Sequence, residues 1–171
     1  MKKRISLVLT FVFLTAGGVT AQRSFYNKEF KFGFKYPAGS KLSRNPHSMF
    51  ANGTLKGLAQ VSLTNPGRGL GGAAATVSAA NMTQDACRAL SVAEDQPRKK
   101  KFGTVTFDKT AWVEGGMESV HPLEVYRTFH SGVCYEVLLE MGMEKYPKRR
   151  VNESAAFNRL YVILRTFYFR S

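Results

Sequence analysis

The stretch 124–140, EVYRTFHSGVCYEVLLE, constrains the fold more than any other part of the 171-residue chain. Two runs rich in Val, Tyr, Phe and Thr flank Ser131 and Gly132, and glycine tolerates the positive φ that a tight hairpin turn requires. We therefore predict a β-hairpin whose two-residue loop is Ser131-Gly132. In that register Arg127 lies opposite Glu136, which makes an opposite-charge contact between the two strands.

Both faces of this predicted hairpin carry apolar side chains. An antiparallel strand with one face in water alternates apolar and polar residues, and this pattern is missing here. We therefore predict central strands that are covered on both sides. One face carries Val125, Phe129, Cys134 and Leu138, and the other carries Tyr126, Tyr135, Val137 and Leu139.

The N-terminal segment has the composition of a secretory signal peptide. Basic residues at 2–4 precede an apolar run over 5–16, and small residues follow at 19–21. The run is short for a membrane span, which needs about 20 residues. We predict a signal peptide over 1–21 and an exported mature chain over 22–171, periplasmic or secreted, that forms one domain without a transmembrane span. An uncleaved N-terminal anchor is the alternative.

The chain is strongly basic. Its formal net charge is +13, and removal of residues 1–21 takes away three of the 25 basic residues and none of the 12 acidic ones, which leaves +10. Such a surface attracts polyanions and anionic lipid head groups without specifying a partner. We expect the densest clusters to lie in loops and to be either solvated or an anionic-partner surface; nucleic acid is not expected after export. These clusters are Arg98, Lys99, Lys100, Lys101, Lys145, Lys148, Arg149 and Arg150.

The two cysteines, Cys87 and Cys134, are an even number in a chain that we predict to be exported. Disulfides persist in oxidising compartments, so we predict that the two residues are bridged. By the chain-entropy model, a loop of this length contributes about 3 to 4 kcal/mol to stability. Two buried free thiols are the alternative.

Periodicity and turn residues predict the remaining elements. The segment 41–52 is too irregular to assign, and 114–122 reads as a flexible connection. A charged linker over 93–101 and a basic loop over 142–150 complete the chain. We predict strands over 29–36 and 57–64, a glycine-rich loop over 67–72 with a strand continuing over 73–80, a helix over 82–92 capped by Asn81 or Thr83, strands over 102–107 and 110–113 about a turn at Asp108-Lys109, a helix over 153–164 capped by Asn152, and a last strand over 165–170.

Several of these segments occur in an order that resembles exported bacterial proteins with a PsbP/Mog1-like fold. The resemblance covers most of 25–170. It rests on FKFGFKYP, the cysteine-bearing helix, FGTVTF, YRTFHSGVCYEVLLEM, and a C-terminal helix that leads into an aromatic strand. It implies an α/β (α+β) fold, an α/β/α sandwich in which a mainly antiparallel sheet is flanked by helices. Members include photosystem accessory subunits, a GTPase-binding nuclear factor and uncharacterised envelope proteins, so the fold does not transmit a function.

The sequence carries no recognised metal or cofactor pattern. His47, His121 and His130 form no HExxH, and no second cysteine lies near either thiol, so we expect no zinc site. The glycines of 67–72 match the literal spacing of a dinucleotide loop. However, that loop requires a helix directly afterwards, and 73–80 reads as a strand. We therefore expect no cofactor.

Two pairs of residues in the sequence are candidates for catalysis. Cys134 as nucleophile with His130 as base is disfavoured, because the hairpin register places the two side chains on opposite faces. Glu114 and Glu118 could act as a pair of acid catalysts only if they were removed from water, which a glycine-rich loop rarely achieves. A solvated loop is the simpler interpretation. The single tryptophan, Trp112, is assigned to the core by its strand setting, with a binding-surface anchor as the alternative.

These observations favour a non-enzymatic exported binding or accessory module of the bacterial cell envelope, which contacts a protein or an anionic component. Two other classes remain open. One is an enzyme that acts on an envelope substrate through a site that the sequence does not reveal. The other is a structural protein held to a membrane surface by charge.

Overall fold

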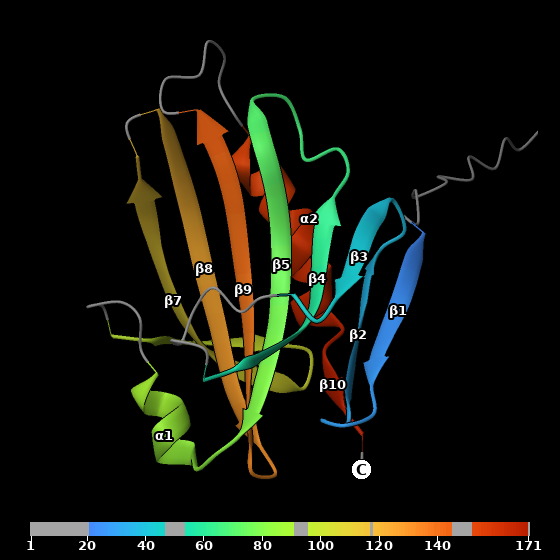
Figure 1. Ribbon diagram of the computed structural model, residues 1–171, viewed down its shortest axis with the longest axis vertical. Coiled ribbons are helices and arrows are strands. Elements are labelled where there is room, and N and C mark those ends of the chain that lie inside the picture. The colour runs from blue at the N-terminus through green and yellow to red at the C-terminus, as the bar shows by residue number, and fades with distance from the viewer. Residues whose placement is uncertain (1–20, 47–53, 91–95, 117, 145–151, 171) are drawn as a thin grey trace, which may run out of the picture.

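The computed structural model describes residues 21–46, 54–90, 96–116, 118–144 and 152–170. Within them, the strands form two antiparallel sheets, and a helix lies on each side of the larger one (Figure 1). The predicted α+β class with mainly antiparallel strands is therefore confirmed. A small second sheet stands beside the first.

The large sheet has the strand order β3-β4-β5-β9-β8-β7-β6, and the small sheet has the order β1-β2-β10. The strands are β1 (Gln22–Asn27), β2 (Phe32–Pro37), β3 (Ser40–Arg44), β4 (Lys56–Leu63), β5 (Leu70–Asn81), β6 (Arg98–Phe102), β7 (Val105–Gly115), β8 (Ser119–His130), β9 (Val133–Glu144) and β10 (Tyr168–Phe169). The helices are α1 (Gln84–Ala89) and α2 (Glu153–Arg165).

The predicted hairpin is present as β8 and β9. Ser131 and Gly132 have φ of 49° and 80°, so the turn needs two positive φ values. The register pairs His130 with Val133 and Arg127 with Glu136, as predicted. Since β5 adds to β9 and β7 adds to β8, the hairpin is central in the large sheet.

The main core lies on the α2 side of the large sheet. The Asn152 side chain accepts a hydrogen bond from the Ala155 N–H (3.0 Å) and caps α2 as predicted. At helical spacing, α2 buries Ala156, Phe157, Leu160, Ile163 and Leu164. These side chains join the hairpin face that carries Tyr126, Tyr135, Val137 and Leu139.

A half-buried carboxylate links α2 to the sheet. Glu124 on β8 accepts hydrogen bonds from the hydroxyls of Tyr126 and Tyr161, both at 2.8 Å, and pairs with Lys109 on β7 at 2.5 Å. Burial, together with the hydrogen bond to Glu124, raises the pKa of Tyr161 to about 12. Both hydroxyls therefore stay protonated as donors, and the carboxylate has three partners from three elements.

The opposite face of the large sheet is covered by smaller clusters, so the prediction of two covered faces is confirmed. Leu55, Cys87 and Cys134 form one cluster beneath α1. Leu123, Val125 and Leu138 form the other, with half-buried Trp112 packed against it. The indole N–H of Trp112 donates to exposed Glu114 at 3.1 Å, so Trp112 lies at the edge of this cluster and not within the core to which the sequence assigned it.

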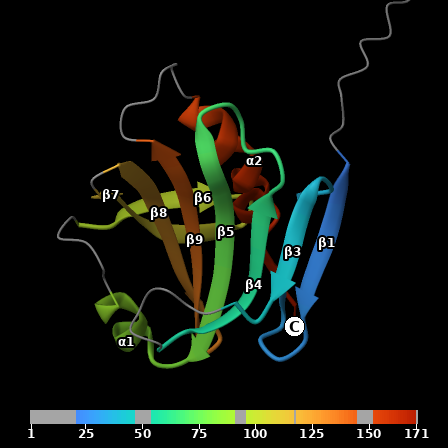
Figure 2. The ribbon, with the colours of Figure 1, turned by 45° about the horizontal axis from the view of Figure 1, so that its top comes forward.

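The small sheet joins the two ends of the described chain. Its aromatic residues, Phe25, Phe32 and Phe34, are buried, and the ring of Phe167 stacks on Phe32 with centroids 5.2 Å apart. β1 lies next to β3 (Figures 1 and 2), where the Arg44 guanidinium lies 5.4 Å from the Phe25 ring centroid. The predicted strand over 29–36 starts later, at Phe32, and β1 and β3 were not predicted because their patterns are weak.

The predicted position of the turn between the two strands before the hairpin is wrong. β6 and β7 meet at Gly103, where φ is 57°, and Asp108 and Lys109 lie inside β7. The linker over 93–101 is corrected in part, because Arg98 to Lys101 form an edge strand. The connection over 114–122 is also shorter than expected, since β7 extends to Gly115 and β8 begins at Ser119.

The bounds of the other predicted helices and strands differ less from those in the structure. α1 is shorter than 82–92 and its N-cap is Thr83. The strand over 57–64 is confirmed as β4, and 73–80 lies within β5. At the C-terminal end α2 continues to Arg165, so the strand predicted over 165–170 is reduced to β10. Of the basic loop predicted over 142–150, residues 142–144 belong to β9, and 145–150 lie outside the described residues.

Candidate functional site

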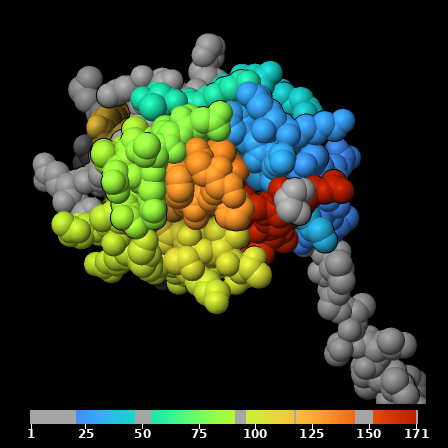
Figure 3. Space-filling model, turned by 90° about the horizontal axis from the view of Figure 1, so that it is seen from below, coloured from blue at the N-terminus to red at the C-terminus, as the bar shows by residue number. Residues whose placement is uncertain are grey.

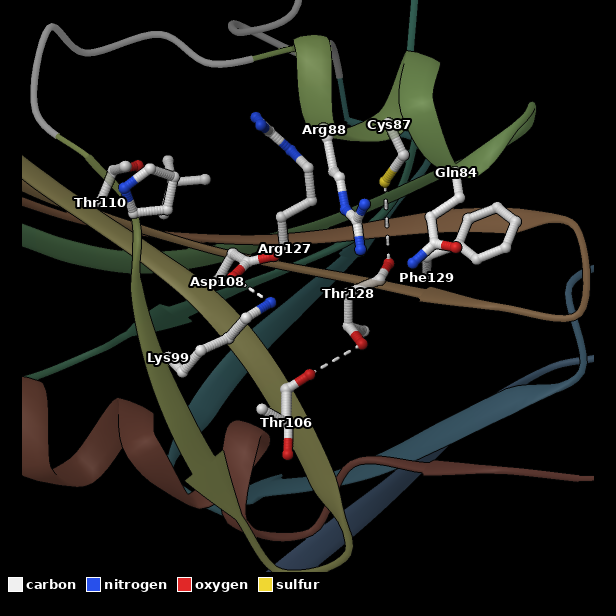
Figure 4. Close-up of a pocket in the computed structure, with 12 residues that line it drawn as sticks. Gln84, Cys87, Arg88, Lys99, Thr106, Asp108, Thr110, Arg127, Thr128 and Phe129 are labelled. Carbon is white, nitrogen blue, oxygen red and sulfur yellow. Dashed lines mark hydrogen bonds and ion pairs between the residues drawn. The ribbon is translucent and has the colours of Figure 1, made fainter.

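A pocket of about 580 Å³ lies between α1 and strands β6, β7 and β8 (Figure 4). We call it the α1 pocket. From α1 it is lined by Gln84, Cys87 and Arg88, and from the strands by Lys99, Asp108 and Arg127, among others. Concave sites with an apolar lining and a few convergent polar groups are typical of ligand-binding pockets.

The strand side of the α1 pocket is organised by four charged residues on neighbouring strands. Glu136 on β9 is opposite Arg127 on β8, Arg127 is opposite Asp108 on β7, and Asp108 is opposite Lys99 on β6. We call these residues the charge row. Their signs alternate, and each cross-strand pairing of opposite charges is favourable.

Two ion pairs stabilise the charge row. Arg127 is 9% exposed and Glu136 is 2% exposed, and their side chains meet at 2.5 Å (Nη2 to Oε2) and 3.2 Å (Nε to Oε2). The outer pair, Lys99 with Asp108, has an N–O distance of 2.6 Å and is more exposed. The two pairs leave the row without a net charge.

Arg88 changes this balance. It lies in the last turn of α1, and Figure 4 shows its side chain and that of Arg127 extending into the space between α1 and the strands. Among the described residues, no carboxylate forms an ion pair with Arg88. The α1 pocket therefore carries one positive charge that the described residues do not neutralise, beside a second guanidinium.

Apolar surface completes the α1 pocket. Val125 and Phe129 on β8 contribute to its lining together with Pro97. Guanidinium groups bind carboxylate and phosphate oxygens through paired hydrogen bonds. The arrangement is therefore able to hold an anionic group against an apolar wall.

The disulfide fixes the helix side of the α1 pocket. Cys87 and Cys134 are bridged, with their Cα atoms 5.5 Å apart and a sequence separation of 47, which confirms the predicted pairing. Cys87 is the buried residue of α1, and its Sγ lies 4.0 Å from the carbonyl oxygen of Thr128. At this end of the molecule α1, the hairpin tip and the β6–β7 region form one continuous surface (Figure 3).

The predicted basic clusters are only partly in this site. Lys99 lines the α1 pocket, and Arg98, Lys100 and Lys101 are exposed on the same edge strand. Lys145, Lys148, Arg149 and Arg150 lie outside the described residues. The anionic-partner surface as a whole stays a prediction.

The Cys134–His130 dyad is not assembled. Cys134 is in the disulfide and pairs across the hairpin with Phe129, whereas His130 lies on the other face and stacks on Phe169 with centroids 4.1 Å apart. Among the residues that the structure places, no group of three His, Cys, Asp or Glu side chains is arranged to hold a metal ion.

A second, more open hollow of about 1100 Å³ lies where β5 and β9 reach the opposite end of the sheet. Glu118, His121 and Glu140 contribute to its lining, and His121 is a strand residue rather than a loop residue. Burial raises the pKa of Glu140, and nearby Glu114 raises it further while His121 lowers it. The distance between His121 Nε2 and Ser119 Oγ is 3.2 Å, but both residues lie at the exposed start of the same strand, β8.

Sequence reasoning found part of the α1 pocket. It predicted the Arg127–Glu136 contact and placed Lys99 in a basic cluster, but it did not connect either of them with Arg88 or Asp108. The signal that was available for Arg88 was its position next to Cys87, since a disulfide from α1 to the hairpin brings both residues over β8. Asp108 could not be placed, because the predicted turn removed it from the strand.

Comparisons with known proteins show a fold and no family. No protein-family model matches the chain, and no curated protein matches it. The chain is similar to a crystal structure of a protein from Bacteroides thetaiotaomicron VPI-5482, with a TM-score of 0.58 and 12% identity over 86% of this chain. It spans 48% of that protein, and the similarity shows a shared fold alone.

A cyanobacterial PsbP is a second similar structure. The solution structure of this protein (CyanoP) from Synechocystis sp. PCC 6803 gives a TM-score of 0.40 with 10% identity, over 91% of this chain and 96% of that one. Within the described residues, no helix has the length and hydropathy needed to cross a membrane.

Proposed function

We propose that the chain is an exported, non-enzymatic binding module and that the α1 pocket is its ligand site. The observation that carries the proposal is the convergence of Arg88 and Arg127 on one pocket, where Arg127 is already paired with Glu136 and Arg88 has no acidic partner among the described residues. The ligand is a small molecule or an envelope component that presents a carboxylate or a phosphate.

Three further features support this proposal. The pocket volume is within the range of small-molecule sites. The cations on β6 add attraction for an anion approaching the same edge of the sheet. The disulfide agrees with a protein that works in an oxidising compartment, outside the cytoplasm.

The test uses two probes, phenyl phosphate and phenylacetate, which carry the two anionic groups on an aromatic body. Each is titrated at low ionic strength into the ¹⁵N-labelled protein lacking residues 1–21, and amide shifts are followed by NMR. We expect shifts at residues 84–88, 106–110 and 125–129 for at least one probe. Arg88→Gln should weaken that binding by about tenfold or more, because a charge-assisted hydrogen bond contributes about 1.5 to 3 kcal/mol.

Arg23→Gln is the matched control. Arg23 is an exposed arginine on β1, in the small sheet, and its loss changes the net charge by the same amount. The control should bind the probe like the unchanged protein. Equal loss in the two variants, or shifts outside the α1 pocket, would show that the probes respond to the overall charge and would contradict the proposal.

A further inference from the structure

We infer that the α1 pocket forms only when Cys87 and Cys134 are bridged, so that ligand capture is confined to the oxidised chain. The reduced chain keeps the large sheet but does not hold α1 over it. The ligand part of this inference rests on the proposed function, whereas the placement of α1 by the disulfide does not. The consequence is that the protein is unable to capture its ligand before it reaches an oxidising compartment.

The helix itself is too short to hold its place. α1 has six residues, and isolated helices shorter than about 12 to 15 residues are marginal in water. Cys87 is the residue of α1 that is buried, and Thr83 caps the helix through the Ala86 N–H at 3.2 Å. Cys87 is the part of α1 that enters the cluster on the sheet, while half-buried Met82 and Leu90 pack there from either end of the helix and the Met82 N–H donates to the Gly132 carbonyl at 3.1 Å.

The bridge lies in the middle of the pocket-lining part of α1. Gln84 and Arg88 lie on either side of Cys87 in the sequence, and all three line the α1 pocket. The other sulfur belongs to Cys134, which is fully buried and pairs with Phe129 on β8 and with Ala80 on β5. The disulfide therefore joins a six-residue helix to a central strand.

The strand side of the pocket does not depend on the bridge. The charge row is held by strand pairing and by the buried Arg127–Glu136 pair, and α2 packs on the other face of the same strands. Loss of the bridge should therefore remove Gln84 and Arg88 from the pocket and leave Lys99, Asp108 and Arg127 in position.

The chemistry of formation is a thiol–disulfide exchange. The Cys87 and Cys134 thiols lose two protons and two electrons as the S–S bond forms, and a disulfide-bearing oxidant is reduced to two thiols. In the folded protein Cys87 is 3% exposed and Cys134 is 0% exposed, so an attacking thiolate has little access to either sulfur. Once formed, the bridge should persist.

The test compares the oxidised protein with Cys87→Ala/Cys134→Ala and with unchanged protein refolded under reductant. The first readout needs no ligand: Cα chemical shifts of residues 84–89 report whether α1 is helical, and amide exchange reports the protection of β8, β9 and α2. We expect α1 to lose its helical shifts and at least 90% of its protection, while protection of β8, β9 and α2 persists. Thr83→Ala, which keeps the bridge, should retain the α1 shifts.

The second readout is phenyl phosphate titration, in which the unbridged forms should bind at least tenfold more weakly than the oxidised protein. A helical, protected α1 in the unbridged forms would overturn the inference, as would collapse of the whole sheet, because the strand side would then depend on the bridge. If the oxidised protein binds neither anionic probe, the proposed function fails, and the shifts of α1 still decide the role of the disulfide.

Discussion

At the scale of single residues, the buried pair of Arg127 and Glu136 is the main electrostatic element of the pocket. Removing one member of a buried pair leaves an uncompensated charge, at a cost of about 3 to 5 kcal/mol. We expect Glu136→Ala to lower the free energy of unfolding by about 3 kcal/mol, the lower end, because Asp108 lies opposite Arg127 on its other side. Urea denaturation measures the change.

The control for this prediction is an exposed ion pair. Lys56 and Glu29 meet at 2.9 Å, but their side chains are 55% and 59% exposed. Because exposed pairs contribute about 0 to 1 kcal/mol, Lys56→Ala should have a correspondingly small effect. A loss at Glu136 no larger than the loss at Lys56 would contradict the role assigned to the buried pair.

Glu140 provides a prediction about pH. Its pKa in the folded chain is raised by burial, so the folded state binds the proton more tightly than the unfolded state does. Stability should therefore fall as pH rises from the unfolded value of about 4.5 through the raised folded value, and the whole penalty is present above it. We expect Glu140→Gln to raise the free energy of unfolding at pH 7 and to lose this advantage at pH 4.

The matched change is Glu118→Gln, which removes an exposed carboxylate beside the same hollow. It should alter the free energy of unfolding by no more than about 0.5 kcal/mol at either pH, as is usual for surface substitutions. Denaturation curves of both variants at pH 4 and pH 7 check the prediction. An advantage of Glu140→Gln that is the same at both pH values would exclude the buried carboxylate as its cause.

At the scale of elements, α2 supplies the largest apolar face that packs on the sheet. Leu160 is fully buried, and replacing a buried leucine by alanine costs about 2 to 5 kcal/mol. We expect this loss for Leu160→Ala in thermal and chemical unfolding. Asn158→Ala, at an exposed position of the same helix, should change the stability by less than about 0.5 kcal/mol. Similar effects of the two changes would mean that α2 does not stabilise the fold by packing.

The edge strand β6 gives a second prediction at this scale. Lysine on an edge strand opposes pairing with the edge of another molecule. Replacing Arg98, Lys100 and Lys101 by threonine should therefore promote self-association, which light scattering measures; Lys99 is kept because it pairs with Asp108.

The control replaces three exposed cations, Lys28, Lys35 and Arg68, which lie in turns or on the central strand of the small sheet. This variant has the same change of charge and should associate no more than the unchanged protein does. Association of both variants would assign the effect to net charge rather than to the edge of β6.

The elements that could be predicted are those whose signals are local. The hairpin register followed from Gly132 and the apolar runs around it, and α2 followed from its cap and its periodicity. The turn between β6 and β7 was missed because Asp108 and Lys109 look more like turn residues than Gly103 and its neighbours do. In β7 these two charges are tolerated because each has a partner on an adjacent strand.

The candidate site was less predictable than the fold. The disulfide could be inferred from the cysteine count, but the pocket depends on three strands meeting under a short helix. Long-range pairing of β6, β7 and β8 decides which charges become neighbours. No local pattern in the sequence identifies that set.

At the scale of the whole molecule, net charge predicts a weak attraction to anionic membranes. With residues 1–21 removed the formal charge is +10. Binding to vesicles that contain phosphatidylglycerol should fall at least tenfold between about 0.05 and 0.5 M NaCl, because salt screens exposed charges. Co-sedimentation measures it, with neutral phosphatidylcholine vesicles as the control. Binding that does not respond to salt would point to a specific lipid site instead.

The small sheet contains strands from both ends of the described chain, and these strands are synthesised at different times. β1 and β10 both pair with β2, and the Arg170 N–H donates to the Lys31 carbonyl at 2.8 Å. A chain that emerges amino end first, from a ribosome or through a membrane channel, has no β10 with which to finish this sheet until its last residues arrive. The edge of β2 that pairs with β10 therefore stays open until the C-terminal strand has been made, so the small sheet is completed late in synthesis.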